Sequence, residues 1–354
     1  MKFLCLALCI ALCALDACVP TVPAPPLEEG DWQLLVATDE PVSRLLLLSQ
    51  PNNRIANQNL FLNVDSIRGI GGKVRKIALP TGAFREYVFV LMPEEFKIEV
   101  LSATSYRRIT TISFANDRRE PSDIIPVNAT TAYIAFRNAP MLTVFDLFNI
   151  RIARDVRVGT SPISALDVIG NQLFCALQDE NAVAVVATNY TGSNATEALL
   201  ARIPVPRAPQ FLAHTANGSE LIVVCAGGGA QRLASRVAVV SIAERRVLRE
   251  ATLFSDAADS SNDRPYGLAI TDRDFAYIPM NKDVAKVDVR SLARASVLPG
   301  VFRNVSFSPE RLEIVLADSS AFPTCAIIAS KNDSLTATIS LENVRAQIRQ
   351  INSR

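Results

Sequence analysis

The chain has 354 residues, of which 49% are hydrophobic and 20% charged, and its formal net charge is +1. A chain of this length can bury a large hydrophobic core, so it needs no framework of disulfide bonds in order to fold. The near-neutral charge argues against the broadly basic surface by which proteins bind nucleic acid.

Residues 1–18 have the layout of a cleavable secretory signal. Lys2 precedes an apolar stretch, residues 3–15, that is shorter than the ~20 residues needed to span a membrane. The stretch ends in Leu-Asp-Ala-Cys at residues 15–18, which resembles the bacterial lipobox that directs lipid transfer to the cysteine thiol and cleavage before it. Asp16 departs from the small or hydroxyl residue usual there, so ordinary cleavage beside an incidental cysteine is the alternative. We therefore expect an exported lipoprotein of the bacterial cell envelope, anchored in the outer membrane through Cys18.

The next segment, residues 19–30, is rich in proline and predicts a semi-rigid tether to a folded domain at 31–354. This domain contains Cys175, Cys225 and Cys325, which show no metal-ligand spacing. We expect them to be buried and unreactive thiols.

Between Trp32 and Ile339, short β-branched and aromatic runs alternate with turn-forming residues, a pattern typical of sandwiches, barrels and propellers. One unit recurs about seven times at the spacing of four-stranded propeller blades. A regular copy has strands at 133–136, 142–146 and 152–156, and the first copy, at 34–37 and 45–48, is less regular. The sequence thus predicts an all-β fold, a β-propeller with seven blades of four antiparallel strands; six or eight blades are the alternatives, because the first copy fits the pattern poorly.

The domain begins at the second strand of its first blade, so an inner strand must come from elsewhere. The alternating tail at residues 344–351 could supply this strand and close the ring, and a frayed terminal segment is the alternative.

The repeated motifs resemble those of the YVTN or YncE-like seven-bladed β-propellers. Residues 133–136 (Tyr-Ile-Ala-Phe) stand where that family has Tyr-Val-Ala-Asn, and residues 142–146 (Leu-Thr-Val-Phe-Asp) where it has Val-Ser-Val-Ile-Asp. Departures are the frequent loss of the asparagine and Lys286, which interrupts an alternating strand. The resemblance implies an exported protein that acts as a binding module or scaffold for a protein or carbohydrate ligand.

Signatures of catalysis are sparse. His214 is the only histidine, and its place beside Thr215 and Asn217 favours a structural hydrogen bond over a role as general base. One histidine is also too few for the usual imidazole-based metal sites, so no metal or other cofactor is expected. Carboxylates that could serve hydrolysis or calcium binding fall at scattered turns: Asp39, Glu40, Asp263 and Asp283. A propeller enzyme of the lactonase or lyase type and a structural subunit of an outer-membrane assembly remain as alternatives.

One set of cations recurs at similar places, just before the inner strands: Lys73, Arg119, Arg207, Arg264 and Arg303. Cations that converge on the mouth of the central channel would concentrate a positive field on an anion. We expect an anionic ligand, such as an acidic glycan, to bind there. The alternative is that these are scattered loop residues paired with carboxylates such as Glu120 and Asp263.

Overall fold

The computed structural model describes residues 33–38, 43–49, 54–57, 59–60, 70–79, 86–189, 198–228, 233–253, 264–309, 311–318, 324–340 and 348–353. The expected signal, Cys18, the tether and three of the turn carboxylates, Asp39, Glu40 and Asp263, lie outside these residues. In the described part, no helix is long and apolar enough to cross a membrane.

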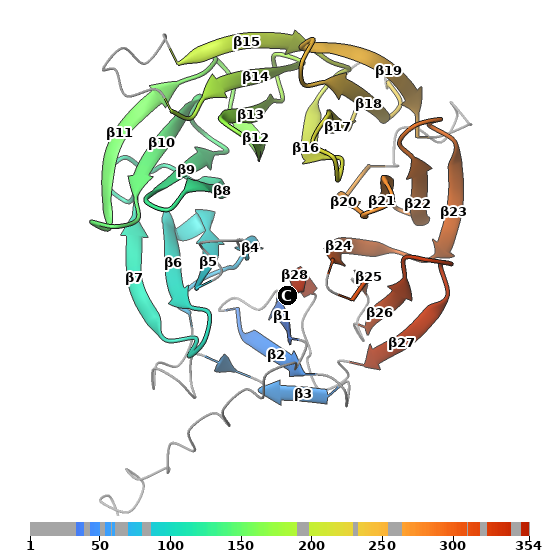
Figure 1. Cartoon of the computed structure of the whole chain (residues 1–354). Coiled ribbons are helices and arrows are strands. Elements are labelled where there is room, and N and C mark those ends of the chain that lie inside the picture. Colours follow the sequence, from blue (N-terminus) through green and yellow to red (C-terminus); the bar gives the residue numbers. More distant parts are fainter. Residues whose placement is uncertain are drawn as a thin grey trace, which may run out of the picture.

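The described strands form seven four-stranded antiparallel sheets set radially around a common axis (Figure 1). We call them blades and give each from its inner to its outer strand. Blade 1 is β28 (Ile348–Ser353), β1 (Gln33–Thr38), β2 (Leu45–Ser49) and β3 (Arg54–Asn57). Blade 2 is β4 (Lys76–Ala78), β5 (Tyr87–Met92), β6 (Lys97–Ser102) and β7 (Arg108–Ser113), with a 3-10 turn at Pro93–Glu95. Blade 3 is β8 (Pro121–Asn128), β9 (Thr131–Phe136), β10 (Met141–Asp146) and β11 (Arg151–Arg157).

The remaining blades follow the same order in the chain. Blade 4 is β12 (Ile163–Ile169), β13 (Gln172–Leu177), β14 (Ala182–Ala187) and β15 (Leu199–Pro204). Blade 5 is β16 (Pro209–His214), β17 (Glu220–Cys225), β18 (Arg236–Ser241) and β19 (Arg246–Thr252). Blade 6 is β20 (Ala269–Ile270), β21 (Phe275–Pro279), β22 (Asp283–Asp288) and β23 (Arg294–Pro299). Blade 7 is β24 (Phe302–Ser308), β25 (Glu313–Asp318), β26 (Thr324–Ala329) and β27 (Leu335–Ser340). The expected propeller class is confirmed.

The ring closes as the tail pattern predicts. β28 pairs antiparallel with β1, so that Leu34 lies opposite Ser353 and Val36 opposite Ile351. Residues 344–347 of the predicted strand lie outside the described part, and the strand itself begins at Ile348. The two ends of the domain therefore share one sheet.

The middle strands are buried on both faces because each blade packs between two neighbours. β13 and β17 have one partly exposed residue each, at their first position, whereas β19 alternates between exposed and half-buried along its length. Between blades 2 and 3, Phe114 packs edge-on against Phe136, with ring centroids 4.9 Å apart. Strands that are covered on both faces have continuous apolar sequences, and this explains the apolar runs that recur in the sequence repeats.

The three cysteines of the domain are free and buried, as expected. Burial raises the pKa of all three thiols, that of Cys325 to about 12. Because the thiolate is the reactive form, these side chains act as small core residues.

Lys286, the departure from the family pattern, joins two blades. Its Nζ donates to both carboxylate oxygens of Asp333 in blade 7, at 2.8 and 3.0 Å, and the Tyr277 hydroxyl donates to the same carboxylate. The ammonium also lies 4.2 Å from the centre of the Phe275 ring. A charge in a buried strand is thus satisfied by an ion pair and an aromatic face.

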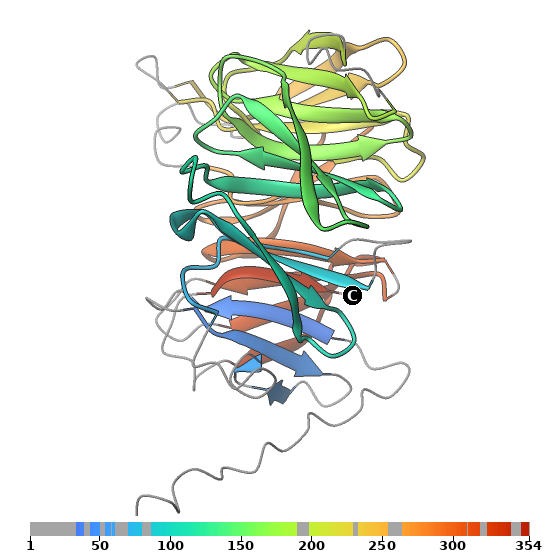
Figure 2. The same ribbon diagram turned by 90° about the vertical axis from the view of Figure 1, so that its left-hand side faces the viewer.

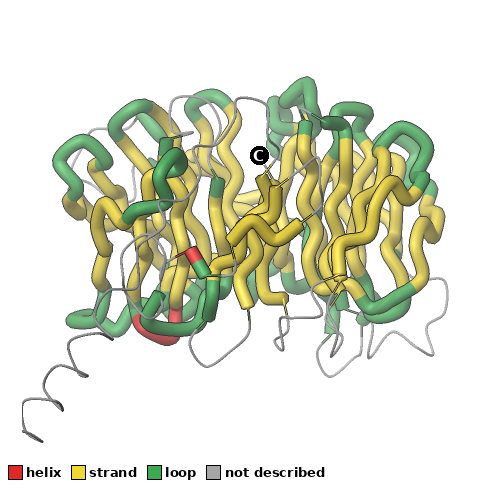
Figure 3. The backbone as a smooth tube through the Cα atoms, turned by 90° about the horizontal axis from the view of Figure 1, so that it is seen from below, coloured by secondary structure: helices red, strands yellow, loops and turns green. Residues whose placement is uncertain are grey.

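The antiparallel strands place their turns on two opposite faces of the disc, which Figure 2 and Figure 3 show from the side. Face 1 carries the turns that join inner to second strands and third to outer strands. Face 2 carries the turns between second and third strands and the crossovers from one blade to the next.

Candidate functional site

The inner strands enclose a central channel with a cavity at each end. The cavity at face 2 measures about 500 Å³ and that at face 1 about 880 Å³. Both are lined by Lys76 and Asp123, whose Nζ and Oδ1 lie 2.6 Å apart. This ion pair between blades 2 and 3 therefore lies at the boundary between the two cavities.

The face 2 cavity, which we call the basic mouth, is lined by four cations from three blades: Arg75, Lys76, Arg137 and Arg303. Asp123 is the one carboxylate among its described lining residues. The remaining wall is formed by small and apolar residues of inner strands, together with Tyr266. Several cations at the end of a narrow channel favour anions over cations and neutral molecules.

Two of these cations are held by carboxylates that brace the mouth. Arg75 donates to Glu94 Oε1 from Nε at 2.8 Å and from Nη2 at 2.6 Å. Arg137 donates to Glu120 and lies 3.6 Å from Glu94. Burial opposes ionisation of Glu94, but the hydrogen bond from Arg75 and the charges of both arginines lower its pKa. Arg75 and Arg137 are thereby fixed in place and largely neutralised.

Arg303 differs because its described contacts are all uncharged. Its guanidinium carbon lies 3.6 Å from the centre of the Tyr266 ring, and Nη1 donates to Asn281 Oδ1 at 3.1 Å. The Tyr266 hydroxyl donates to the same amide oxygen, which fixes the ring under the guanidinium. Burial lowers the pKa of Arg303, as it does for any cation removed from water without a counter-charge. The stacked arginine is therefore oriented and lacks a carboxylate partner among the described residues, which suits it to a ligand anion.

The structure does not gather the five cations that the sequence analysis placed at one mouth. Arg303 lines the basic mouth, and the other four are absent from its described lining residues. Arg207 lines a separate groove of about 560 Å³ between the outer strands of blades 4 and 5. Arg264 is exposed two residues before Tyr266, and the backbone N–H of Lys73 donates to Glu95.

Arg119 is turned away from the channel by its own loop. Its N–H donates to the carbonyl of Phe114, and its side chain runs outward to Thr143 at 2.8 Å and Asp155 at 2.9 Å, on the third and outer strands of blade 3. The guanidinium also lies 4.9 Å from the centre of the Phe136 ring. Glu120, the partner expected for such loop arginines, pairs with Arg137.

Asp283, the described member of the four turn carboxylates, forms a two-oxygen ion pair with Arg294 at 2.9 and 3.1 Å. This pair joins neighbouring strands of blade 6 and lies outside both channel ends.

The face 1 cavity has mainly apolar walls and contains a histidine–carboxylate pair. His214 Nδ1 lies 3.0 and 2.9 Å from the two oxygens of Asp167, which sits on the neighbouring inner strand. His214 makes its side-chain hydrogen bond to Asp167, and its neighbours Thr215 and Asn217 bond to each other in the turn. Sequence reasoning missed Asp167 because it lies 47 residues away, in another blade.

The His214–Asp167 pair should make stability depend on pH. The hydrogen bond from Asp167 and its charge raise the pKa of His214, although partial burial opposes this. A raised folded-state pKa adds stability that is present below the unfolded pKa of ~6.5 and lost as pH rises through the folded value. The His214 side chain is 43% exposed, so we expect the loss to stay below about 1 kcal/mol.

Urea unfolding of the wild type and His214→Gln between about pH 5 and pH 9 measures this contribution. The difference in unfolding free energy between the two proteins should shrink as pH rises. A difference that stays constant, or grows with pH, would contradict the assigned role of Asp167.

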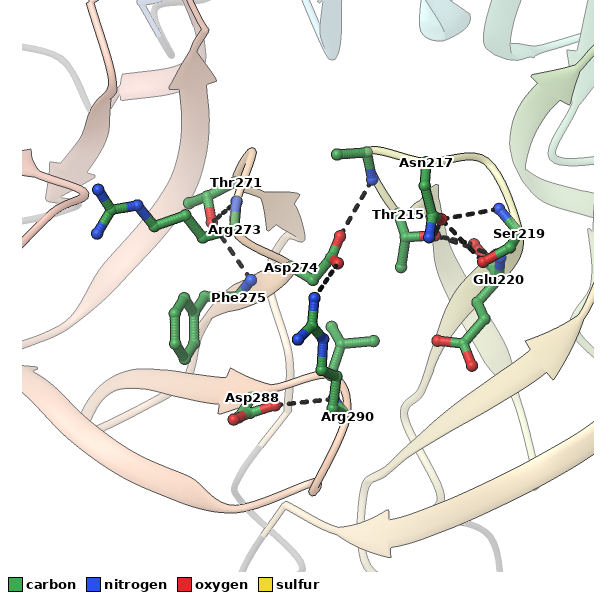
Figure 4. A network of polar contacts seen from close by, with 12 residues as sticks. Thr215, Asn217, Ser219, Glu220, Thr271, Arg273, Asp274, Phe275, Asp288 and Arg290 are labelled. Carbon is green, nitrogen blue, oxygen red and sulfur yellow. Dashed lines mark hydrogen bonds and ion pairs between the residues drawn. The ribbon is translucent and has the colours of Figure 1, made fainter.

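Besides the basic mouth and the His214–Asp167 pair, a cluster of polar side chains links blades 5 and 6 on face 1 (Figure 4). Asp274 accepts a hydrogen bond from the Ala216 N–H at 3.1 Å and lies 3.7 Å from Arg290. Nearby, Arg249 donates to both oxygens of Glu220. These groups satisfy one another, so the cluster braces two turns.

No cluster of three or more histidine, cysteine or acidic side chains in the described residues could hold a metal ion. No family model matches the chain, and no curated protein matches it. Among solved structures, the chain is similar to one titled Kuenenia stuttgartiensis Hydrazine Synthase, with a TM-score of 0.56 and 13% sequence identity. The match covers 80% of this chain and 83% of that chain. At this identity the similarity supports the propeller fold.

Proposed function

We propose that the protein is a non-catalytic binding propeller of the bacterial cell envelope, related to the YncE-like type and tethered to the outer membrane through Cys18. Its ligand is an anionic molecule, such as an acidic glycan, held at the basic mouth. The lipobox-like residues 15–18 support the anchor, and the order of the repeated motifs supports the family.

The observation that carries the ligand class is Arg303. It is stacked on Tyr266, hydrogen-bonded to Asn281 and without a described carboxylate partner, so a ligand carboxylate could take its remaining donors. The other cations of the mouth are already paired with Glu94, Glu120 or Asp123, so Arg303 is the lining cation best placed to bind a ligand anion. The chain's one histidine, His214, lies in the face 1 cavity and is absent from the described lining of the basic mouth.

Replacing Arg303 should weaken anion binding strongly. A hydrogen bond to a charged group contributes about 1.5–3 kcal/mol, so Arg303→Gln should raise Kd for a galacturonate oligosaccharide by roughly tenfold or more. Arg303→Lys keeps the charge but loses the planar fork, and we expect an intermediate Kd. Isothermal titration calorimetry measures the three affinities.

Arg118→Gln is the matched control, because Arg118 is exposed on the same face but does not line the mouth. It should bind as the wild type does. Equal binding of the corresponding neutral galactose oligosaccharide, or wild-type affinity in Arg303→Gln, would refute the proposed ligand class.

A further inference from the structure

Face 1 exposes apolar side chains in its turns and at the first residues of its outer strands: Phe148, Ile150, Leu312, Ile109, Ile152 and Leu335. In the described turns of face 2 the exposed large hydrophobic residues are Leu233 and Val301. The six side chains come from blades 2, 3 and 7, and apolar side chains exposed mainly on one face of a domain indicate a surface that meets a partner or a membrane.

The most exposed of these residues is held out by a braced turn. Phe148 is 80% exposed at the tip between β10 and β11. The carboxylate of Asp146 accepts the N–H groups of Phe148 and Asn149, both at 3.0 Å, and the Asn149 side-chain amide at 2.7 Å. Ile150 follows with a φ of 52° and is also exposed. Because Asp146 fixes the turn, Phe148 is presented outward even though burial would be favourable.

The same face carries cations around its rim. Each third-to-outer turn that the structure describes completely presents an exposed cation at the turn or at the next residue: Arg107, Arg108, Arg151, Arg246, Arg290 and Lys331. The side chains of Arg151 and Arg290 are 71% and 82% exposed, and their nearest carboxylates lie 3.7 Å away. Exposed ion pairs of this kind contribute little to folding stability, so Arg151 and Arg290 can exchange their carboxylate partner for another anion at little energetic cost.

Two carboxylates in these turns are directed inward, whereas Glu244 is exposed and pairs with Arg246. Asp146 braces the Phe148 turn, and Asp288 accepts the N–H groups of Arg290 and Ser291 at 2.8 and 3.2 Å. At these two turns the carboxylate supports the backbone, while Arg151 and Arg290 face solvent.

The chain also enters the domain at this face. Gln33, the first residue of β1, pairs with Ser49 at the start of a third-to-outer turn, and Leu34 lies opposite Ser353. Cys18 precedes Gln33 by 15 residues. At about 3.3–3.6 Å per residue, such a segment reaches at most about 50 Å.

We propose that face 1 rests against a bilayer with anionic headgroups, where the Phe148 turn enters the interface and the rim cations contact lipid phosphates. The inference rests on the proposed membrane tether at Cys18. Apolar insertion combined with basic side chains is a common mode of peripheral membrane binding. The basic mouth, on face 2, would then point away from the bilayer and stay open to its ligand.

Vesicle co-sedimentation tests the proposal with the mature chain carrying Cys18→Ser, so that no lipid anchor contributes. We expect binding to vesicles of phosphatidylethanolamine and phosphatidylglycerol, weaker binding to phosphatidylcholine alone, and loss of binding when NaCl rises from about 0.05 M to about 0.5 M. The triple variant R107E/R108E/R151E should lower the partition coefficient at least tenfold, and Phe148→Ser should lower it severalfold.

The matched control is R118E/R207E/K282E, which makes the same charge change at exposed residues of face 2. It should change the partition coefficient less than twofold. Equal loss in both triple variants, or equal binding to the two vesicle types, would overturn the proposal. Intact-mass analysis of Cys18 in the purified membrane fraction tests the anchor separately, so the two failures can be told apart.

Discussion

A chain that ends at Gln347 should lose at least about 2 kcal/mol of unfolding free energy, because about four to six backbone hydrogen bonds of roughly 0.5–1.5 kcal/mol each disappear with β28. The loss also uncovers one edge of β1, whose Leu35 and Val36 are 2% and 0% exposed. An open, apolar strand edge favours pairing with other chains, so the truncated protein should self-associate as well. Urea unfolding followed by circular dichroism, together with light scattering, measures both effects.

Deleting Arg354 alone is the control, since it leaves β28 intact. A synthetic peptide of residues 344–354 should restore part of the lost stability by pairing with β1 in trans. Unchanged urea resistance in the truncated chain would show that β28 does not hold the ring together.

Asp123→Ala should cost about 3 kcal/mol of unfolding free energy, because a buried carboxylate with three donors is removed. Its oxygens accept Lys76 Nζ at 2.6 Å, the Ile124 N–H at 2.8 Å and the Leu166 N–H at 3.0 Å. The first and last of these donors belong to blades 2 and 4, so one side chain connects three consecutive blades. Without it, two backbone donors and one ammonium lose their acceptor beside the channel.

Asp123→Asn keeps one acceptor oxygen and should show an intermediate loss in urea unfolding. Asp179→Ala, at an exposed turn of face 2, is the control and should change the unfolding free energy by less than about 0.5 kcal/mol. An Asp123→Ala protein as stable as the control variant would show that the three donors find other partners.

Much of the fold could be predicted from sequence because each repeat contains the local pattern of strands and turns that forms one blade. Continuous apolar runs marked the middle strands, turn residues separated them, and an alternating tail marked β28. Ring closure was predictable because the first blade visibly lacked an inner strand. The inner strands were harder to recognise, since they are only partly covered; β20 is two residues long.

The site was less accessible to sequence reasoning. Arg303 was identified because it precedes the predicted inner strand of its blade. The other three mouth cations were missed: Arg75 and Lys76 lie at the start of inner strand β4, and Arg137 follows β9, the second strand of blade 3. Asp123 gave a usable signal, as a lone carboxylate in the inner strand of blade 3, between Ser122 and an Ile-Ile pair. Side-chain direction could not be read, which is why Arg119, held outward by its loop, was placed wrongly.

Pairing of β28 with β1 also fixes the time at which the domain can form. The two strands are separated by almost the whole domain, so blade 1 cannot be completed until β28 has been synthesised. Contacts this distant in sequence form late and slow the folding of β proteins. Blades 2 to 7 each consist of strands that are consecutive in the chain and can pair first, so the addition of β28 to β1 is the step that completes the ring.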